Sequence, residues 1–124
     1  MKIYCGTDII EIDRIKKNIE NNSNAFRNRV YTEKEIEYCE SKNNQKYQHY
    51  AARFAAKEAV FKALSDKLDN KYDIEWKDIE IENNEQGRPR VNLNIEKIGI
   101  KIDDIDVSIS HCKEYASATA IILD

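Results

Sequence analysis

The stretch Ala51-Ala52-Arg53-Phe54-Ala55-Ala56-Lys57-Glu58-Ala59-Val60-Phe61-Lys62-Ala63-Leu64 decides the fold, because it predicts a long helix that another backbone can approach closely. It is rich in alanine, lysine and glutamate and contains neither glycine nor proline, which favours one helix from about Lys46 to about Leu68. At about 100° per residue its alanines fill one continuous arc. Phe54 and Phe61 lie together on a neighbouring sector.

The charges of this helix are not spread evenly around it. Glu58 and Lys62 fall between the alanine arc and the phenylalanine sector, whereas Arg53 and Lys57 fall on the far side, where we expect solvent. A charge beside an apolar surface needs a partner or a metal ion. The alternative is an ordinary Glu-to-Lys pair one turn apart, which is worth only about 0.2–0.5 kcal/mol.

The residues before the long helix predict one strand and two shorter helices. Ile3–Ile10 is apolar and β-branched, and Gly6 inside it indicates a bulge or a close backbone approach. Asp13 is placed to cap a helix that runs through Ile19, and Thr32-Glu33-Lys34-Glu35 matches a capping box that opens a helix to about Cys39. Polar loops are expected at Asn18–Asn24 and Ser41–Gln45.

The residues after the long helix predict mainly extended structure. Segments with strand character are Ile74, Trp76, Ile79 and Ile81, then Val91–Ile95, Val107–Ser110 and Tyr115–Leu123. Asn83–Pro89 is expected to turn, Glu96–Lys101 to form a short helix or turn, and His111–Glu114 to join the last two strands. The sequence therefore predicts one α+β domain over residues 1–124, with a long central helix packed on an antiparallel sheet.

Composition excludes several classes of function. The net charge of −3 argues against a nucleic-acid binder that works by bulk attraction, and no apolar run approaches the roughly 20 residues of a membrane span. The N-terminus lacks a signal-peptide pattern. The three cysteines form no C-x-x-C pair, which fits reduced thiols in a cytoplasmic protein. Cys112 follows His111, but we expect a buried, inert thiol there and not a catalytic pair.

Asp8 stands inside an apolar strand, where aspartate is disfavoured. It either caps the following helix or binds a hard cation. Two carboxylates from separate elements, completed by phosphate oxygens and water, make a typical magnesium site. His111 lies at a strand end, where binding residues collect, although a surface-turn histidine is the alternative. His49 is expected to be structural or exposed.

Basic side chains gather between Glu11 and Val30, where five basic residues face three acidic ones. The basic residues are Arg14, Lys16, Lys17, Arg27 and Arg29. They form either a solvated helix face or a docking surface for an acidic protein partner.

Four blocks of the sequence resemble the holo-[acyl-carrier-protein] synthase family, the short class of phosphopantetheinyl transferases. The blocks are Gly6–Ile15, Arg53–Leu64, Gly87-Arg88-Pro89 and Ser108–Ala116. Their spacing and the total length also fit, so the resemblance spans nearly the whole chain.

The resemblance implies transfer of the 4'-phosphopantetheine group of coenzyme A to a serine of an acyl carrier protein, with release of adenosine 3',5'-bisphosphate, in support of fatty acid biosynthesis. It implies that Asp8 and Glu58 bind magnesium and that Lys62 contacts the phosphate chain. Arg53 and His111 would be further coenzyme A contacts. The members of this class are typically trimers, with each site shared between adjacent subunits.

The resemblance further implies that the turn Gly87-Arg88-Pro89 lies near the adenine nucleotide, and that Arg14 and Lys17 meet the acidic carrier protein. One departure concerns Ser65-Asp66, where the family usually has a glycine turn; here the helix is expected to continue. Two other functions use the same residues. They are a magnesium-dependent phosphoanhydride hydrolase and a non-catalytic module that binds coenzyme A.

Overall fold

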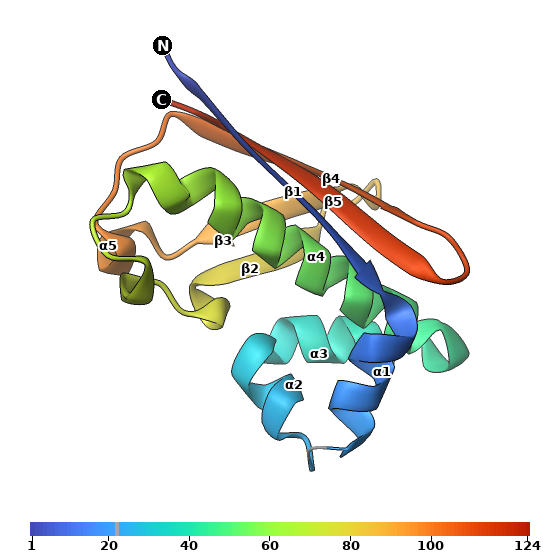
Figure 1. The fold of residues 1–124 in the computed structure, drawn as a ribbon. Helices are drawn as coiled ribbons and strands as arrows, with labels where there is room; N and C mark the ends of the chain where they lie inside the picture. The colour runs from blue at the N-terminus through green and yellow to red at the C-terminus, as the bar shows by residue number, and fades with distance from the viewer. Residues whose placement is uncertain (22) are drawn as a thin grey trace.

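The computed structural model describes residues 1–21 and 23–124, and it has the predicted α+β architecture (Figure 1). Its α-helices are α1 (Ile12–Asn21), α2 (Ala25–Val30), α3 (Glu33–Glu40), α4 (Lys46–Leu64) and α5 (Ile95–Ile98). Its strands are β1 (Ile3–Glu11), β2 (Ile79–Asn83), β3 (Pro89–Leu93), β4 (Asp104–His111) and β5 (Tyr115–Leu123). Short 3-10 helices are η1 (Asn43–Gln45), η2 (Ser65–Lys67), η3 (Lys71–Asp73) and η4 (Trp76–Asp78).

The strands form two antiparallel sheets. One has the order β1-β5-β4, so the first strand pairs with the last and the termini lie side by side; the other is the β2-β3 hairpin. Figure 1 shows α4 between the larger sheet and the hairpin, with α1, α2 and α3 gathered at one end of it. Within the described residues, no helix is long and apolar enough to cross a membrane.

The alanine arc of α4 is the surface that packs against the sheet. Its members are all buried, namely Ala51, Ala52, Ala55, Ala56, Ala59 and Ala63. Gly6 of β1 crosses this arc so closely that an added Cβ would overlap the backbone oxygen of Ala59. The close approach predicted for Gly6 is confirmed, and it holds β1 directly against the helix.

The prediction that Arg53 and Lys57 face solvent is wrong. Arg53 is 3% exposed and Lys57 is 0% exposed. The reason is that α4 contacts the sheet on one side and α3 and β2 on others, so the helix has no broad solvent face. The Lys57 amine is instead paired with Glu35 at 2.6 Å and donates to the carbonyls of Val30 and Trp76 at 2.7 and 3.2 Å.

The capping box before α3 is confirmed, because Glu35 N donates to Thr32 Oγ1 at 3.3 Å and Thr32 N donates to Glu35 Oε1 at 2.9 Å. The strand predicted over Ile74 and Trp76 is wrong. Trp76 lies in η4, and β2 begins only at Ile79. Ile74 is buried without being in a strand, so its apolar character reflects packing and not strand pairing.

Several helices begin or end at residues other than those predicted from the sequence. The helix α4 ends at Leu64 and gives way to η2, where Ser65 Oγ donates to the Lys62 carbonyl at 2.7 Å, so Ser65-Asp66 does not continue the α-helix. Asp13 lies in the first turn of α1, which begins at Ile12, and is not its cap. The helix α1 extends into the predicted Asn18–Asn24 loop, of which Asn22 lies outside the described residues. The helix α2 was not predicted.

Candidate active site

Asp8 and Lys62 meet where β1 crosses α4. Alternation along β1 turns Gly6, Asp8 and Ile10 toward the helix. The Lys62 amine donates to Asp8 Oδ1 at 3.2 Å and to the Thr7 carbonyl at 3.0 Å. The Asp8 side chain is only 15% exposed, so this carboxylate is sheltered and directed at the helix.

Glu58 lies one helical turn before Lys62 and completes a group of three charged side chains, which we call the acidic group (Asp8, Glu58 and Lys62). Burial, followed by the charge of Asp8, raises the pKa of Glu58, and Lys62 opposes that change. The two carboxylates therefore repel each other. A bound cation would relieve this repulsion, so the acidic group fits a magnesium ion by its chemistry.

Asp8 and Glu58 supply only part of a magnesium coordination shell. Among the described residues, no third His, Cys, Asp or Glu joins Asp8 and Glu58 to complete a metal site. Magnesium commonly keeps several waters and takes one or two carboxylates together with substrate phosphates. The acidic group therefore resembles a magnesium site whose coordination shell is completed by a substrate that carries phosphate.

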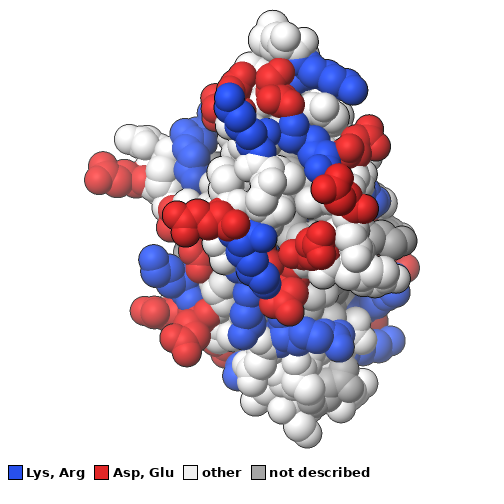
Figure 2. Space-filling view, turned by 90° about the vertical axis from the view of Figure 1, so that its left-hand side faces the viewer, with Lys and Arg blue, Asp and Glu red and all other residues white. Residues whose placement is uncertain are grey.

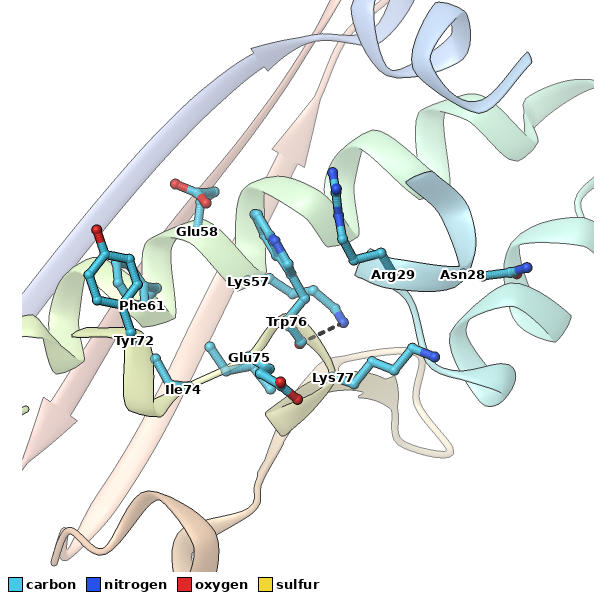
Figure 3. Close-up of a pocket in the computed structure, with 11 residues that line it drawn as sticks. Asn28, Arg29, Lys57, Glu58, Phe61, Tyr72, Ile74, Glu75, Trp76 and Lys77 are labelled. Atoms are coloured by element: carbon cyan, nitrogen blue, oxygen red, sulfur yellow. Dashed lines mark hydrogen bonds between the residues drawn. The ribbon is translucent and has the colours of Figure 1, made fainter. Parts of the chain in front are cut away.

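A cavity of about 660 Å³ opens beside Glu58 (Figure 3). Its apolar wall comes from Phe61, Ile74 and Trp76, and Trp76 stacks on Phe54 with ring centroids 5.0 Å apart. Arg29 lies at another part of the lining. The sequence did not reveal this cavity. The chain's single tryptophan, set among charged residues, was the one available signal, and it was read as part of a strand.

Arg53 lies on a different side of α4 from Glu58, since five residues correspond to about 140° around a helix. Its Nη2 donates to Asn83 Oδ1 at 2.6 Å, and Asn83 Nδ2 donates to the Gly87 carbonyl at 2.8 Å. The buried guanidinium is thereby tied to the β2-β3 turn that contains Gly87, Arg88 and Pro89. Gly87 has a φ of 81°, which favours glycine.

His111 is exposed at the end of β4, and its ring centroid lies 6.2 Å from that of His49 on α4. The His49 ring in turn lies 5.5 Å from Tyr38, against which the Arg53 guanidinium packs at 3.8 Å. We call Arg53, His111 and the turn Gly87–Pro89 the basic group. Cys112 beside it is exposed, so the expectation of a buried thiol there is wrong.

The predicted site residues thus fall into two groups. In the described part of the chain, no hydrogen bond or ion pair joins the acidic group to the basic group.

The predicted docking residues lie on α1 and face outward. Ile12, Ile15 and Ile19 form the buried side of this helix, which leaves Arg14 and Lys17 exposed. The Lys17 amine lies 3.0 Å from Asp13. On the face shown in Figure 2, basic and acidic side chains are intermixed without a large area of one sign.

Comparison with known proteins gives consistent matches over nearly the whole chain. The family described as the 4'-phosphopantetheinyl transferase superfamily matches residues 4–120. A holo-[acyl-carrier-protein] synthase of Ruminiclostridium cellulolyticum is 46% identical over 128 residues, covering 98% of this chain and 92% of that protein. One of Chlamydia pneumoniae is 47% identical over 124 residues, covering 98% and 97%. The Helicobacter pylori holo-[acyl-carrier-protein] synthase in complex with coenzyme A has a TM-score of 0.82 at 30% identity, covering 95% of this chain and 98% of that chain.

Proposed function

Because the chain belongs to the 4'-phosphopantetheinyl transferase superfamily, as its sequence predicted, we propose that it is a holo-[acyl-carrier-protein] synthase. It transfers the 4'-phosphopantetheine group of coenzyme A to a serine of an apo-acyl carrier protein and thereby serves fatty acid biosynthesis. The observation that carries this proposal is the meeting of Asp8, Glu58 and Lys62 where β1 crosses α4.

The reaction forms one phosphorus–oxygen bond and breaks another. The serine oxygen of the carrier protein attacks the phosphorus on the pantetheine side of the pyrophosphate, and adenosine 3',5'-bisphosphate leaves. The serine proton must pass to a base. Asp8 and Glu58 are the two carboxylates of the acidic group that could take it.

Asp8 and Glu58 would hold the magnesium ion, which supplies positive charge to the pyrophosphate oxygens. Lys62, which donates to Asp8, would contact the same oxygens and add charge as the leaving group departs. The cavity beside Glu58 offers an apolar wall for the pantetheine arm, with Phe61 and Trp76 as its largest members. The cavity therefore orients the arm so that the reacting phosphorus lies at the acidic group.

The basic group binds the nucleotide end of coenzyme A, and we propose that it acts on the site of a neighbouring subunit. The separation of the two groups on one chain supports this arrangement. So does the outer face of the β1-β5-β4 sheet, where Ile3, Ile9, Tyr115 and Ile121 are 62%, 66%, 44% and 46% exposed. Such an apolar face favours self-association, and we propose a homotrimer.

Mass spectrometry of an apo-carrier protein tests the function directly. After incubation with this chain, coenzyme A and magnesium, the carrier should gain one phosphopantetheine, and the Asp8→Ala and Glu58→Ala variants should give no product. Release of adenosine 3',5'-bisphosphate without a carrier would favour the hydrolase, and coenzyme A binding without transfer would favour the non-catalytic module.

A further inference from the structure

One wall of the cavity beside Glu58 is formed by the short 3-10 helix η4, which carries Trp76. The Trp76 side chain is half-buried, and its ring stacks on that of Phe54 with centroids 5.0 Å apart. From inside the protein, the buried Lys57 amine donates to the Trp76 carbonyl at 3.2 Å (Figure 3). Because a 3-10 helix has poorer hydrogen-bond geometry than an α-helix, so short a helix depends on outside contacts to fix its side chains.

Lys97 of α5 holds the same helix from the outside. Its amine donates to Glu75 Oε2 at 3.0 Å, just before η4, and to Asp78 Oδ2 at 2.9 Å, at the end of η4. The same Asp78 oxygen accepts from Glu75 N at 2.8 Å, and the Asp78 carbonyl accepts from Asn94 N at 2.9 Å. Lys97 thus bridges residues on both sides of Trp76 and connects η4 to α5.

The bridge differs from an ordinary exposed ion pair because one of its carboxylates is sheltered. The Asp78 side chain is only 8% exposed, whereas those of Lys97 and Glu75 are 43% and 76% exposed. Burial on its own would raise the pKa of Asp78, but the hydrogen bonds from Glu75 N and Lys97 lower it. The pKa of Lys97 is raised, mainly by its hydrogen bonds to Asp78 and Glu75. Asp78 and Lys97 are therefore both charged at neutral pH, and the amine is held at one point of η4.

We infer that Lys97 is a positioning residue for the transfer reaction: by bridging Glu75 and Asp78, it holds the Trp76 indole as the wall against which the pantetheine arm lies. The inference rests on the proposed function, which places this arm in the cavity. Among the described residues, the cavity lining includes Glu75 and Trp76 but not Lys97, so Lys97 acts through the wall and not by contact with the substrate. A wall that is already ordered lowers the entropic cost of binding the arm.

The test compares two ligands that differ by the pantetheine arm. Coenzyme A carries the arm and adenosine 3',5'-bisphosphate lacks it, and isothermal titration calorimetry of the whole protein in magnesium measures the affinity for each. Lys97→Met removes the bridge, and Lys97→Gln replaces this variant should it fold poorly. Lys97→Arg keeps the charge and the donors, and Lys101→Met removes another exposed lysine as the matched control. Trp76 is the chain's single tryptophan, so acrylamide quenching of its fluorescence reports directly on the wall.

Lys97→Met should bind coenzyme A about three- to tenfold more weakly, because the Trp76 side chain must then be ordered as the ligand binds, and it should bind adenosine 3',5'-bisphosphate as the wild type does. Acrylamide should quench Trp76 more strongly in this variant. Lys97→Arg should restore both properties, and Lys101→Met should leave both unchanged. In a Trp76→Ala background, Lys97→Met should cause no further loss of coenzyme A affinity, because the residue through which Lys97 acts is gone.

Equal weakening for the two ligands, unchanged quenching of Trp76, or an additive loss in the Trp76→Ala background would overturn the inference. A higher KM for the carrier protein with unchanged coenzyme A affinity would overturn it as well, because Trp76 would then face the carrier and not the arm. If the wild type still modifies the carrier protein in these cases, the proposed function stands. Absence of any coenzyme A binding by the wild type would overturn both.

Discussion

Lys57 is fully buried, and its amine links three segments of the chain. Its amine contacts Glu35 of α3, the Val30 carbonyl at the end of α2 and the Trp76 carbonyl of η4, so it fixes two walls of the cavity beside Glu58. Burial lowers the pKa of Lys57, and the Glu35 carboxylate opposes that effect. The pair therefore positions the part of α4 that carries Glu58.

Removing this amine should be costly because it leaves the Glu35 carboxylate buried without its cation. We expect Lys57→Met to lower the free energy of unfolding by about 3–5 kcal/mol, measured by urea denaturation at a fixed protein concentration. Adding Glu35→Gln should recover part of the loss. Lys46→Met breaks the half-buried pair with Glu40, which is far less enclosed than Lys57 and Glu35, and should cost less than about 1 kcal/mol. Equal losses for the two lysines would contradict the assigned role of Lys57.

Glu58 gives a prediction with a defined pH dependence. Its folded-state pKa lies above the ordinary value of 4.5, so the folded protein binds the proton more tightly than the unfolded chain does. Ionisation therefore destabilises the fold, and the stability of the wild type should fall relative to Glu58→Gln as the pH rises through the window above 4.5. Without magnesium, denaturation should show equal stabilities near pH 4 and a more stable variant at pH 7. The variant should also lose at least about 100-fold in turnover. A wild type that stays the more stable protein at pH 7 would refute the repulsion between Asp8 and Glu58.

At the scale of elements, the contact between β1 and α4 depends on Gly6. We expect Gly6→Ala to cost about 1–3 kcal/mol, because the new methyl group overlaps the backbone of Ala59 and separates strand from helix. Transfer activity should fall as well, since Asp8 moves away from Glu58. The control is Gly99→Ala, which has open space around it but a φ of 74°, and which should cost about 1–2 kcal/mol without loss of activity in carrier modification. Full activity of folded Gly6→Ala would show that the crossing does not set the site.

The helix α1 gives the docking prediction, because its buried isoleucines turn Arg14 and Lys17 outward. Reversing both charges, as Arg14→Glu with Lys17→Glu, should raise KM for the carrier protein at least tenfold while KM for coenzyme A changes little. Steady-state kinetics with each substrate varied in turn make the distinction. Equal increases in both KM values would remove the docking assignment.

Features that depend only on residues within one segment were predicted correctly from the sequence. Features that depend on contacts between distant segments were not. The capping box at Thr32 and the alanine arc of α4 are complete within their own segments, so they were predicted correctly. The burial of Arg53 and Lys57 could not be predicted, because periodicity assumes one covered face, whereas α4 is enclosed by the sheet, α3 and the hairpin. Trp76 was misassigned for the same reason, since its neighbours Phe54 and Lys57 are distant in sequence.

The same distinction between local features and contacts between distant segments applies to the candidate site. Asp8, Glu58 and Lys62 were predicted together from an anomalous strand aspartate, a helix sector and a family resemblance. In the structure Lys62 donates to Asp8, and the charge of Asp8 contributes to the raised pKa of Glu58. The association of His49 with Tyr38 and His111 has no pattern in the sequence, because the three residues come from three elements. Contacts of this kind become visible only when the chain is folded.

At the scale of the whole molecule, the separation of the acidic and basic groups predicts complementation between two inactive chains. One chain carries Glu58→Gln, and the other carries His111→Ala with Arg88→Ala. When they are co-expressed, a site that takes Glu58 from the second chain and His111 and Arg88 from the first is intact. With random assembly into rings, about one quarter of the sites meet this condition, so the mixture should regain about a quarter of wild-type activity.

The complementation requires the two chains to assemble into mixed oligomers, so preventing that assembly is the control. Chains purified separately and mixed without subunit exchange should stay inactive. Ile9→Asp with Ile121→Asp on the outer sheet face should abolish the recovery, and analytical ultracentrifugation should then find monomers where the unaltered sheet face gives the proposed oligomer. A site contained in one chain would give no recovery under any condition, because each chain then keeps its own defect. Recovery that requires the sheet face would instead show that the catalytic site depends on the quaternary structure. The exposed apolar surface of β1 and β5 would then bring the acidic group of one subunit to the basic group of another.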